Sequence, residues 1–274
     1  MNNGFVVVVD NSWYIGFIPF YIYFALRAYP DAQVFIYLRG KLDNEIRKQT
    51  EVLSPKGQWT IFENYKIDYP NNVFTTKALR WTILHDTNKM SKNIYIGDID
   101  IMFSIEEFSL FEQHLIHCLA MGLPYSNIIR GKFQRLTGLH FIKVFEYMEH
   151  MREIIKKYDI LLKNKCKHWG ISNESLLFDM LKEANLLPIE NTMIVGYDPK
   201  QINFRPHHGV HLGLFKCHKK SAMDFSIPYQ KYLIDFLKTF EENSELVNIL
   251  KKSNPKVSFL FNKAISYVKT KLMN

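Results

Sequence analysis

The chain has 274 residues, of which 47% are hydrophobic and 23% charged, and these proportions exclude a disordered or fibrous protein. Its net charge of +8 suits nucleic acid, an anionic lipid surface or a phosphorylated substrate, or reflects a basic surface without a dedicated partner. We expect no signal peptide and no membrane span, and three cysteines without a CxxC motif are typical of free thiols. These features together predict a cytoplasmic protein.

Strand and helix patterns alternate through the first hundred residues. Residues 4–10 form a β-branched run that ends in Asp10, as expected for a strand buried on both faces of a parallel sheet. This alternation predicts an α/β fold with a mainly parallel central sheet, whose ligands bind at the carboxyl ends of the strands. Further strands are expected at 33–38, 59–64 and 93–97, and helices at 15–30, 41–53 and 74–90.

The second half of the chain is richer in helical patterns. Strands are expected at 138–144 and 193–196, and residues 203–220 have no clear period, which indicates a loop. Helices are expected up to about residue 163 and over 172–188, where Ser172 or Asn173 can cap the helix. The patterns predict one domain over 1–225 and a basic, helical C-terminal extension over 226–274.

The most informative motif is an acidic pair, Asp98 and Asp100, that directly follows an apolar strand. In an extended chain, residues two apart point to the same side, so both carboxylates could bind one Mn²⁺ or Mg²⁺ ion. Such an ion can bridge two phosphates and neutralise the charge of a departing nucleoside diphosphate. An ordinary strand-to-loop junction, where Asp is common, is the alternative interpretation.

These segments resemble the GT-A glycosyltransferases, most closely the retaining family 8 type. The resemblance extends over about residues 4–216 and implies a GT-A, Rossmann-like catalytic domain. Its nucleotide-binding half would span about 1–104, and the half that closes the metal site and binds the acceptor about 105–225. The matching segments are VVVVDNSWY (6–14), ALRWTIL (78–84), YIGDID (95–100), GLHFI (138–142) and HHGVHLGLFK (207–216).

The resemblance also implies the residues that bind the donor nucleotide and its sugar. At the end of the first strand, the base would stack on Tyr14 and hydrogen bond to Asp10, and plain packing of Tyr14 is the alternative. An Arg on the helix before the acidic pair would reach the donor sugar or its phosphates, although a structural salt bridge would also satisfy it. The implied donor-binding residues are Asp10, Asn11, Tyr14, Arg80, Asp98, Gly138, His208 and Lys216, with Thr137 and His140 lining the same cleft.

In the family, a late His-x-x-Gly-x-x-Lys loop closes the metal site. Here the loop from His211 through Gly213 to Lys216 is one residue shorter between His and Gly, so its register is open. His211 is the first choice for the third metal ligand after Asp98 and Asp100, and His208 is the second. Lys216 would contact the diphosphate as a point charge.

The helix start at Asn173 and Glu174 matches the place of an acidic or amide pair near the reacting sugar. With Asp100, these two are the predicted catalytic residues. If the reaction inverts configuration, Glu174 would be the general base for the acceptor hydroxyl. If it retains configuration, a carboxylate or amide there would stabilise the positive charge at the reacting carbon. Alternatively, Glu174 only favours the positive helix N-terminus.

The implied function is metal-dependent transfer of a sugar from a nucleotide-diphosphate sugar to a glycan acceptor. The resemblance suggests a UDP-sugar as the donor and surface polysaccharide synthesis as the process. A metal-dependent phosphoryl or nucleotidyl transferase shares the same features, although no P-loop motif is present. A basic nucleic-acid-binding module is disfavoured because no finger or RNP motif occurs, and we expect no nucleic-acid partner.

The tail over about 255–274 interleaves apolar residues with lysines. It predicts an amphipathic helix that docks on the inner face of an anionic membrane, which would suit a lipid-linked acceptor. A helix that packs on the domain is the alternative.

Overall fold

The computed structural model describes residues 3–10, 12–54, 57–84, 91–130, 134–164, 172–188, 208–216 and 227–272. Within them, a central sheet has the strand order β3-β2-β1-β4-β9-β6. Strands β1, β2, β3 and β4 are parallel, and β9 runs antiparallel to β4 and β6. The predicted α/β fold with a mainly parallel sheet is therefore confirmed. The six strands are β1 (Asn3–Asp10), β2 (Gln33–Arg39), β3 (Trp59–Phe62), β4 (Asn93–Ile96), β6 (Tyr125–Ser126) and β9 (His140–Lys143).

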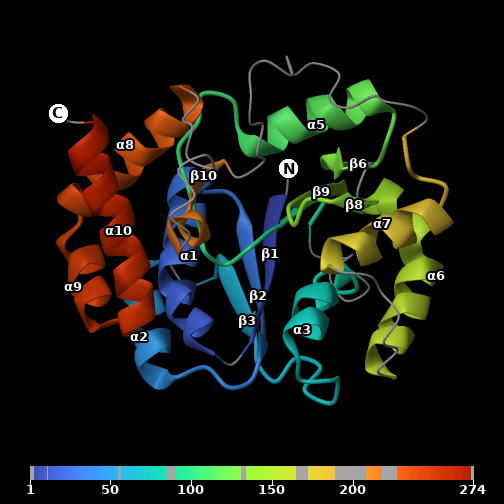
Figure 1. Cartoon of the computed structure of the whole chain (residues 1–274), viewed down its shortest axis with the longest axis horizontal. Coiled ribbons are helices and arrows are strands. Elements are labelled where there is room, and N and C mark those ends of the chain that lie inside the picture. The colour runs from blue at the N-terminus through green and yellow to red at the C-terminus, as the bar shows by residue number, and fades with distance from the viewer. Residues whose placement is uncertain are drawn as a thin grey trace.

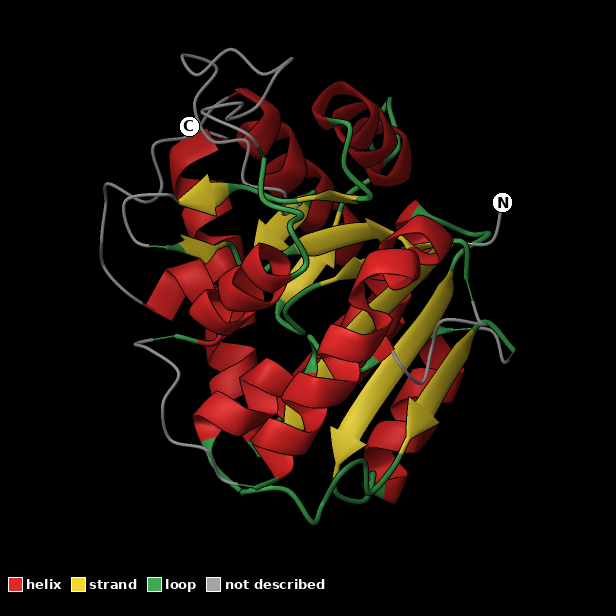
Figure 2. Ribbon diagram, turned by 90° about the vertical axis from the view of Figure 1, so that its right-hand side faces the viewer, coloured by secondary structure: helices red, strands yellow, loops and turns green. Residues whose placement is uncertain are grey.

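Helices cover both faces of the sheet, because its inner strands are apolar on both sides (Figure 1, Figure 2). Phe5, Val7 and Val9 of β1 belong to one core cluster, whereas Val6 belongs to the other. The first cluster packs against α1 (Ile18–Ala28), α5 (Leu110–Met121), α8 (Ile227–Glu242), α9 (Ser244–Lys252) and α10 (Pro255–Leu272). The second packs against α3 (Val73–Leu79), α6 (Val144–Lys163) and α7 (Asn173–Glu183).

The remaining elements are short, apart from α2 (Asn44–Leu53), which packs on α1. Residues 203–220 were expected to form a loop, but the described part, 208–216, contains a strand and a 3-10 helix. That strand, β10, pairs antiparallel with β5, a partner more than 100 residues earlier in the chain. The short elements are η1 (Trp13–Phe17), β5 (Ile101–Phe103), β7 (Ile129–Arg130), β8 (Arg135–Leu136), β10 (Gly209–His211) and η3 (Leu212–Lys216).

Two expected elements differ from the structure or lie outside it. The helix predicted over 74–90 begins at Val73, but α3 ends at Leu79, and Trp81 and Thr82 continue with i→i−3 hydrogen bonds. β-Branched residues such as Thr82 lower the helix propensity there. Residues 85–90 and the strand expected at 193–196 lie outside the described residues. By contrast, Ser172 caps α7 as predicted, accepting a hydrogen bond from the backbone N–H of Ser175.

The C-terminal helix α10 is formed as expected, and its apolar face is buried. Val257, Leu260 and Phe261 are at most 1% exposed and join the first core cluster. The helix contacts η1, η3 and α8, so the apolar side that a docking helix would insert into lipid is already covered. Within the described residues, no helix combines the length and hydropathy needed to cross a bilayer.

Candidate active site

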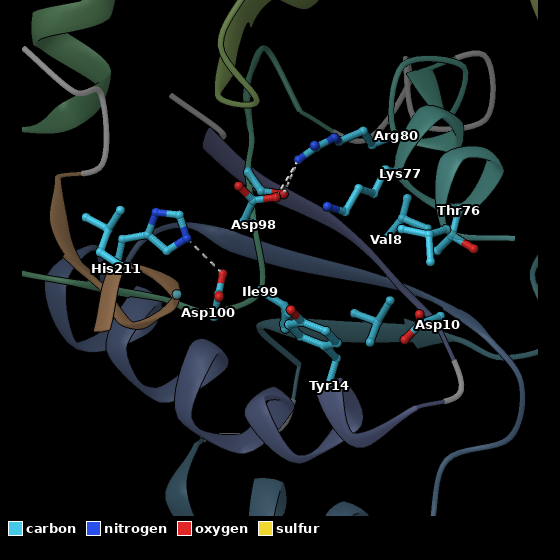
Figure 3. Close-up of a pocket in the computed structure, with 15 residues that line it drawn as sticks. Val8, Asp10, Tyr14, Thr76, Lys77, Arg80, Asp98, Ile99, Asp100 and His211 are labelled. Carbon is cyan, nitrogen blue, oxygen red and sulfur yellow. Dashed lines mark hydrogen bonds and ion pairs between the residues drawn. The ribbon is translucent and has the colours of Figure 1, made fainter. Parts of the chain in front are cut away.

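A cavity of about 510 Å³ opens at the carboxyl edge of the parallel strands (Figure 3). On one side β1 pairs with β4 only up to Val6, opposite Ile96, whereas on the other side it stays paired with β2 up to Asp10. The cavity is lined there by the last residues of β1, 8–10, and by the residues that follow β4, 97–100. The lining residues that can hydrogen bond or carry charge are Asp10, Tyr14, Thr76, Lys77, Arg80, Asp98, Asp100 and His211.

The β5–β10 ladder brings Asp100 and His211 together. His211 is the register partner of Ile101, and the backbone N–H of Leu212 donates to the carbonyl of Asp100 over 2.8 Å. The imidazole Nε2 of His211 then lies 3.2 Å from Oδ1 of Asp100, and the two side chains are 18% and 8% exposed. Of the two histidines considered as a third metal ligand, His211 is therefore the one beside the acidic pair.

The absence of a side chain at Gly213 allows Asp100 and His211 to approach each other, because there is no room for a Cβ at this position. A Cβ at Gly213 would lie 2.6 Å from Oδ2 of Asp100 and 2.9 Å from Nε2 of His211. Both distances are shorter than real Cβ contacts. The 3-10 turn of η3 places the glycine there, only two residues after His211.

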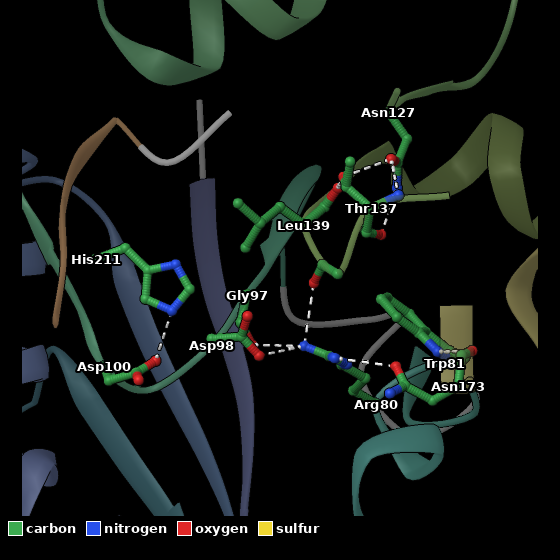
Figure 4. Close-up of polar contacts among 11 residues, drawn as sticks. Arg80, Trp81, Gly97, Asp98, Asp100, Asn127, Thr137, Leu139, Asn173 and His211 are labelled. Carbon is green, nitrogen blue, oxygen red and sulfur yellow. Dashed lines mark hydrogen bonds and ion pairs between the residues drawn. The ribbon is translucent and has the colours of Figure 1, made fainter. Parts of the chain in front are cut away.

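Asp98 faces a different partner (Figure 4). Its Oδ1 accepts a hydrogen bond from Nη1 of Arg80 over 2.7 Å, and the side chains are 35% and 6% exposed, respectively. Arg80 also donates to the carbonyl of Gly138 and to Oδ1 of Asn173, each over 3.0 Å, and lies over the ring of Trp81 at 4.6 Å. The acidic pair therefore lines one cavity, but each carboxylate has its own partner.

Glu174 approaches Asp98 across Gly138. A Cβ at Gly138 would lie 3.5 Å from both Oδ2 of Asp98 and Oε1 of Glu174. Asn173 is buried, and its backbone carbonyl accepts from the indole N–H of Trp81 over 2.8 Å. The α3–α7 contact thus brings the start of α7 to Asp98 and Arg80, with Glu174 half-buried and Asn173 bound to Arg80.

Asp10 and Tyr14 line the cavity at the side away from His211 (Figure 3). The Asp10 carboxylate accepts a hydrogen bond from the hydroxyl of Ser12. The Tyr14 ring stacks on Trp13 with centroids 4.2 Å apart. Asn11, predicted beside them, lies outside the described residues.

His208 does not line the cavity. Its Nδ1 is 2.8 Å from the carboxylate of Glu106 and its Nε2 is 3.1 Å from Nε2 of His114, inside a network that is closed to solvent. Burial alone would raise the pKa of Glu106, but the bond and charge of His208 and the hydroxyl of Tyr232 hold it below its ordinary value. The structure thus shows His208 binding Glu106, which anchors the start of β10.

His140 and Thr137 likewise bond to the protein interior. His140 contacts Asn127 and Tyr147, and burial lowers its pKa to about 3. The Thr137 hydroxyl donates to Oδ1 of Asn127 over 2.7 Å. Neither lines the cavity. The backbone of Lys216 ends η3, but its side chain lies outside the described part of the structure.

The donor types at the acidic pair suit a divalent ion. Ligand atoms at neighbouring corners of an octahedron with bonds of about 2.1 Å lie roughly 3.0 Å apart, close to the 3.2 Å between Asp100 and His211. Among the described residues, no three His, Cys, Asp or Glu side chains are already arranged around one ion, because Asp98 is turned toward Arg80. The separation of Asp100 and His211 is compatible with neighbouring ligand positions, and Asp98 would have to turn from Arg80 to join them.

The sequence did not identify Lys77, which lines the cavity. It also did not identify the strand β5, which follows Asp100 and pairs with β10 next to His211. Lys77 had a signal, because residues three apart on a helix share a face and Arg80 was already a candidate. β5 had little signal, since three residues are too few to show a period.

No protein-family model matches the chain, and no curated protein matches its sequence. Among solved structures it is similar to an active-site mutant of LgtC, with 11% identity, a TM-score of 0.44, and coverage of 65% of this chain and 70% of that one. It is also similar to the glycosyltransferase GlyE of Streptococcus pneumoniae TIGR4, with 11% identity, a TM-score of 0.45, and coverage of 67% and 44%. It is also similar to the bifunctional glycosyltransferase WbbM, with 9% identity, a TM-score of 0.42, and coverage of 66% of this chain and 37% of that one. At these TM-scores the likeness is loose, and the function rests on the site.

Proposed function

We propose that the chain is a metal-dependent glycosyltransferase that moves a sugar from a nucleotide-diphosphate sugar, a UDP-sugar in the first instance, to a glycan acceptor. The observation that carries the proposal is the Asp100–His211 pair, 3.2 Å apart, in one cavity with Asp98. Two carboxylates and an imidazole form a donor set for Mn²⁺ or Mg²⁺. Asp10 at the end of β1 supplies a hydrogen-bond acceptor for a base, and Tyr14 of η1 supplies an aromatic ring.

In the proposed reaction, the bond between the sugar's anomeric carbon and the diphosphate oxygen breaks, and a bond to the acceptor hydroxyl oxygen forms. The ion would neutralise the negative charge that the leaving diphosphate gains. Asp98, Asp100 and His211 would hold the ion, and Gly213 leaves room for the last two to meet. Lys216, at the end of η3, would add a point charge to the diphosphate.

The acceptor hydroxyl must lose its proton during transfer. Glu174 is half-buried near Asp98 and is the proposed base if configuration is inverted. If configuration is retained, its carboxylate would instead stabilise the positive charge at the anomeric carbon. Asn173, whose Oδ1 is bound to Arg80, would act by positioning that arginine.

The direct test incubates the protein with UDP-sugars and Mn²⁺ in the absence of acceptor. Slow release of free sugar together with UDP supports glycosyl transfer. Cleavage at the α-phosphate, which releases UMP and sugar 1-phosphate, would instead identify a nucleotidyltransferase. A protein that consumes no nucleotide sugar from a panel of UDP-, GDP-, CDP- and ADP-sugars would contradict the proposal.

A role in surface polysaccharide synthesis at the inner face of the membrane, with a lipid-linked acceptor, is a separate proposal. With its apolar face buried, α10 would contact lipid through the exposed Lys256 and Phe259 and through the half-buried Lys263, whose ammonium also donates to the carbonyl of Phe215. Vesicle sedimentation of the full chain, compared with a Lys256→Glu and Lys263→Glu double variant, tests this. Equal binding of both proteins to anionic vesicles would count against docking through α10.

A further inference from the structure

Two cationic side chains line the cavity from the same end of α3. Lys77 lies in the last turn of α3, and Arg80 is the first residue after the helix. The two residues are three apart, so they share one face (Figure 3). They differ in what they bind, and this difference assigns them different tasks.

Arg80 is committed to the protein. Its three terminal hydrogen bonds of 3.0 Å or less go to Asp98, to the carbonyl of Gly138 and to Asn173, and its guanidinium lies over Trp81. With 6% of the side chain exposed, it would have to break buried bonds to reach a ligand. Arg80 is therefore a positioning residue, which is bonded to Asp98 in the wall of the cavity.

Lys77 is exposed and has no hydrogen bond or ion pair with any part of the chain that the structure describes. Figure 3 shows its side chain extending from α3 in the direction of Asp98. A Lys ammonium with three free donors is suited to bind a phosphate as a point charge.

The charges of the cavity lead to the same residue. Its lining holds three carboxylates, Asp10, Asp98 and Asp100, and two cations, Lys77 and Arg80. Arg80 and Asp98 neutralise each other, so Asp10, Asp100 and Lys77 are the other formal charges among these five side chains. A nucleotide-diphosphate donor adds about two negative charges. A divalent ion offsets these two charges but not the carboxylates of Asp10 and Asp100, so the cavity stays acidic. Of the described lining side chains, Lys77 is the cation that remains to compensate.

We propose that Lys77 binds the diphosphate of the donor and of the departing nucleotide. The inference rests on the proposed function, because it presumes that a diphosphate enters this cavity. The sequence suggested phosphate contacts for Arg80 and Lys216, and this inference adds Lys77 and leaves Arg80 to position Asp98.

The test measures binding of inorganic pyrophosphate and of UDP, each with Mn²⁺, by isothermal titration calorimetry. The proteins are the wild type, Lys77→Gln and the matched control Lys48→Gln, which replaces an exposed lysine on α2. Loss of a charge-assisted contact predicts at least about tenfold weaker pyrophosphate and UDP binding for Lys77→Gln alone. Uridine binding, which needs no phosphate contact, should be the same in all three proteins.

The outcomes separate this inference from the proposed function. A Lys77→Gln variant that binds pyrophosphate as tightly as the wild type overturns the role of Lys77, whether or not sugar transfer is found. Weaker pyrophosphate binding in that variant supports the role even if no nucleotide sugar is consumed. A wild type that binds neither pyrophosphate nor any nucleoside diphosphate overturns both proposals.

Discussion

Replacing Gly213 with alanine should disable the proposed metal site without altering any ligand. The new Cβ would lie 2.6 Å from Oδ2 of Asp100, whereas ordinary contacts begin at 3.4 Å, so the carboxylate must retreat by roughly 0.8 Å. His211, 2.9 Å from the same Cβ, must move as well. Because the backbone of Gly213 does not lie in the left-handed region, alanine adds no backbone strain. The perturbation is steric and local.

A displacement of this size has a predictable effect on binding and rate. We expect the Kd for Mn²⁺ to rise about 10- to 100-fold, as when the support of a metal ligand is removed. The transfer rate should fall about 100-fold, the typical cost of a 1 Å misplacement at a reacting centre. Overpacking of this kind costs about 1–3 kcal/mol of folding free energy, which corresponds to a decrease in Tm of several degrees for a chain of this size.

The matched control is Gly16→Ala. Its Cβ would lie 3.0 Å from Cγ2 of Val257 on α10, so it also overpacks the structure but meets none of the proposed ligands. Mn²⁺ titrations followed by thermal shift and by transfer rate should separate the two variants: similar loss of Tm, but weaker Mn²⁺ binding in Gly213→Ala alone. If Gly213→Ala retains the wild-type Mn²⁺ affinity and rate, the assignment of Asp100 and His211 is wrong.

Three further predictions concern the acidic pair and the buried polar groups. Asp98→Asn and Asp100→Asn should each abolish transfer while circular dichroism shows an intact fold; transfer by both variants would refute the metal assignment. Glu106→Ala should lower the free energy of unfolding in urea by about 1–3 kcal/mol, because His208 and Tyr232 lose a buried acceptor; an unchanged midpoint would contradict this. The pKa of His140 is about 3 in the fold and about 6.5 unfolded, so its contribution to stability is present above pH 6.5 and is lost as the pH falls toward 3. Stability of the wild type should therefore fall more steeply than that of His140→Gln below pH 6.5, by about 1.4 kcal/mol per pH unit.

Much of the sheet could be predicted because its strands are buried on both faces. The run ending in Asp10 has no polar interruption, and such runs identify inner parallel strands directly. The positions of Asp10 and Asp98 at the carboxyl edge followed from that topology. The helix start at Ser172 was equally readable, since the N-cap is a local interaction of one side chain with one backbone N–H.

The partners of the site residues could not be predicted in the same way. A sequence shows that Arg80 needs an acceptor, but not that Asp98, Gly138 and Asn173 together accept from its two terminal nitrogens. These contacts depend on the packing of α3 against α7, which join segments about 90 residues apart. The same limit hid the burial of His208, whose partner Glu106 lies about 100 residues earlier.

The short spacing between His211 and Gly213 is explained by the turn that separates them. In the family pattern that the sequence resembles, one more residue lies between the His and the Gly. Here β10 ends at His211 and the 3-10 turn of η3 begins at the next residue. The turn places Gly213 against the imidazole of His211. A one-residue slip of β10 against β5 would turn His211 to the opposite face. The shorter loop is therefore compatible with a ligand at His211, and the glycine beneath it makes the close approach to Asp100 possible.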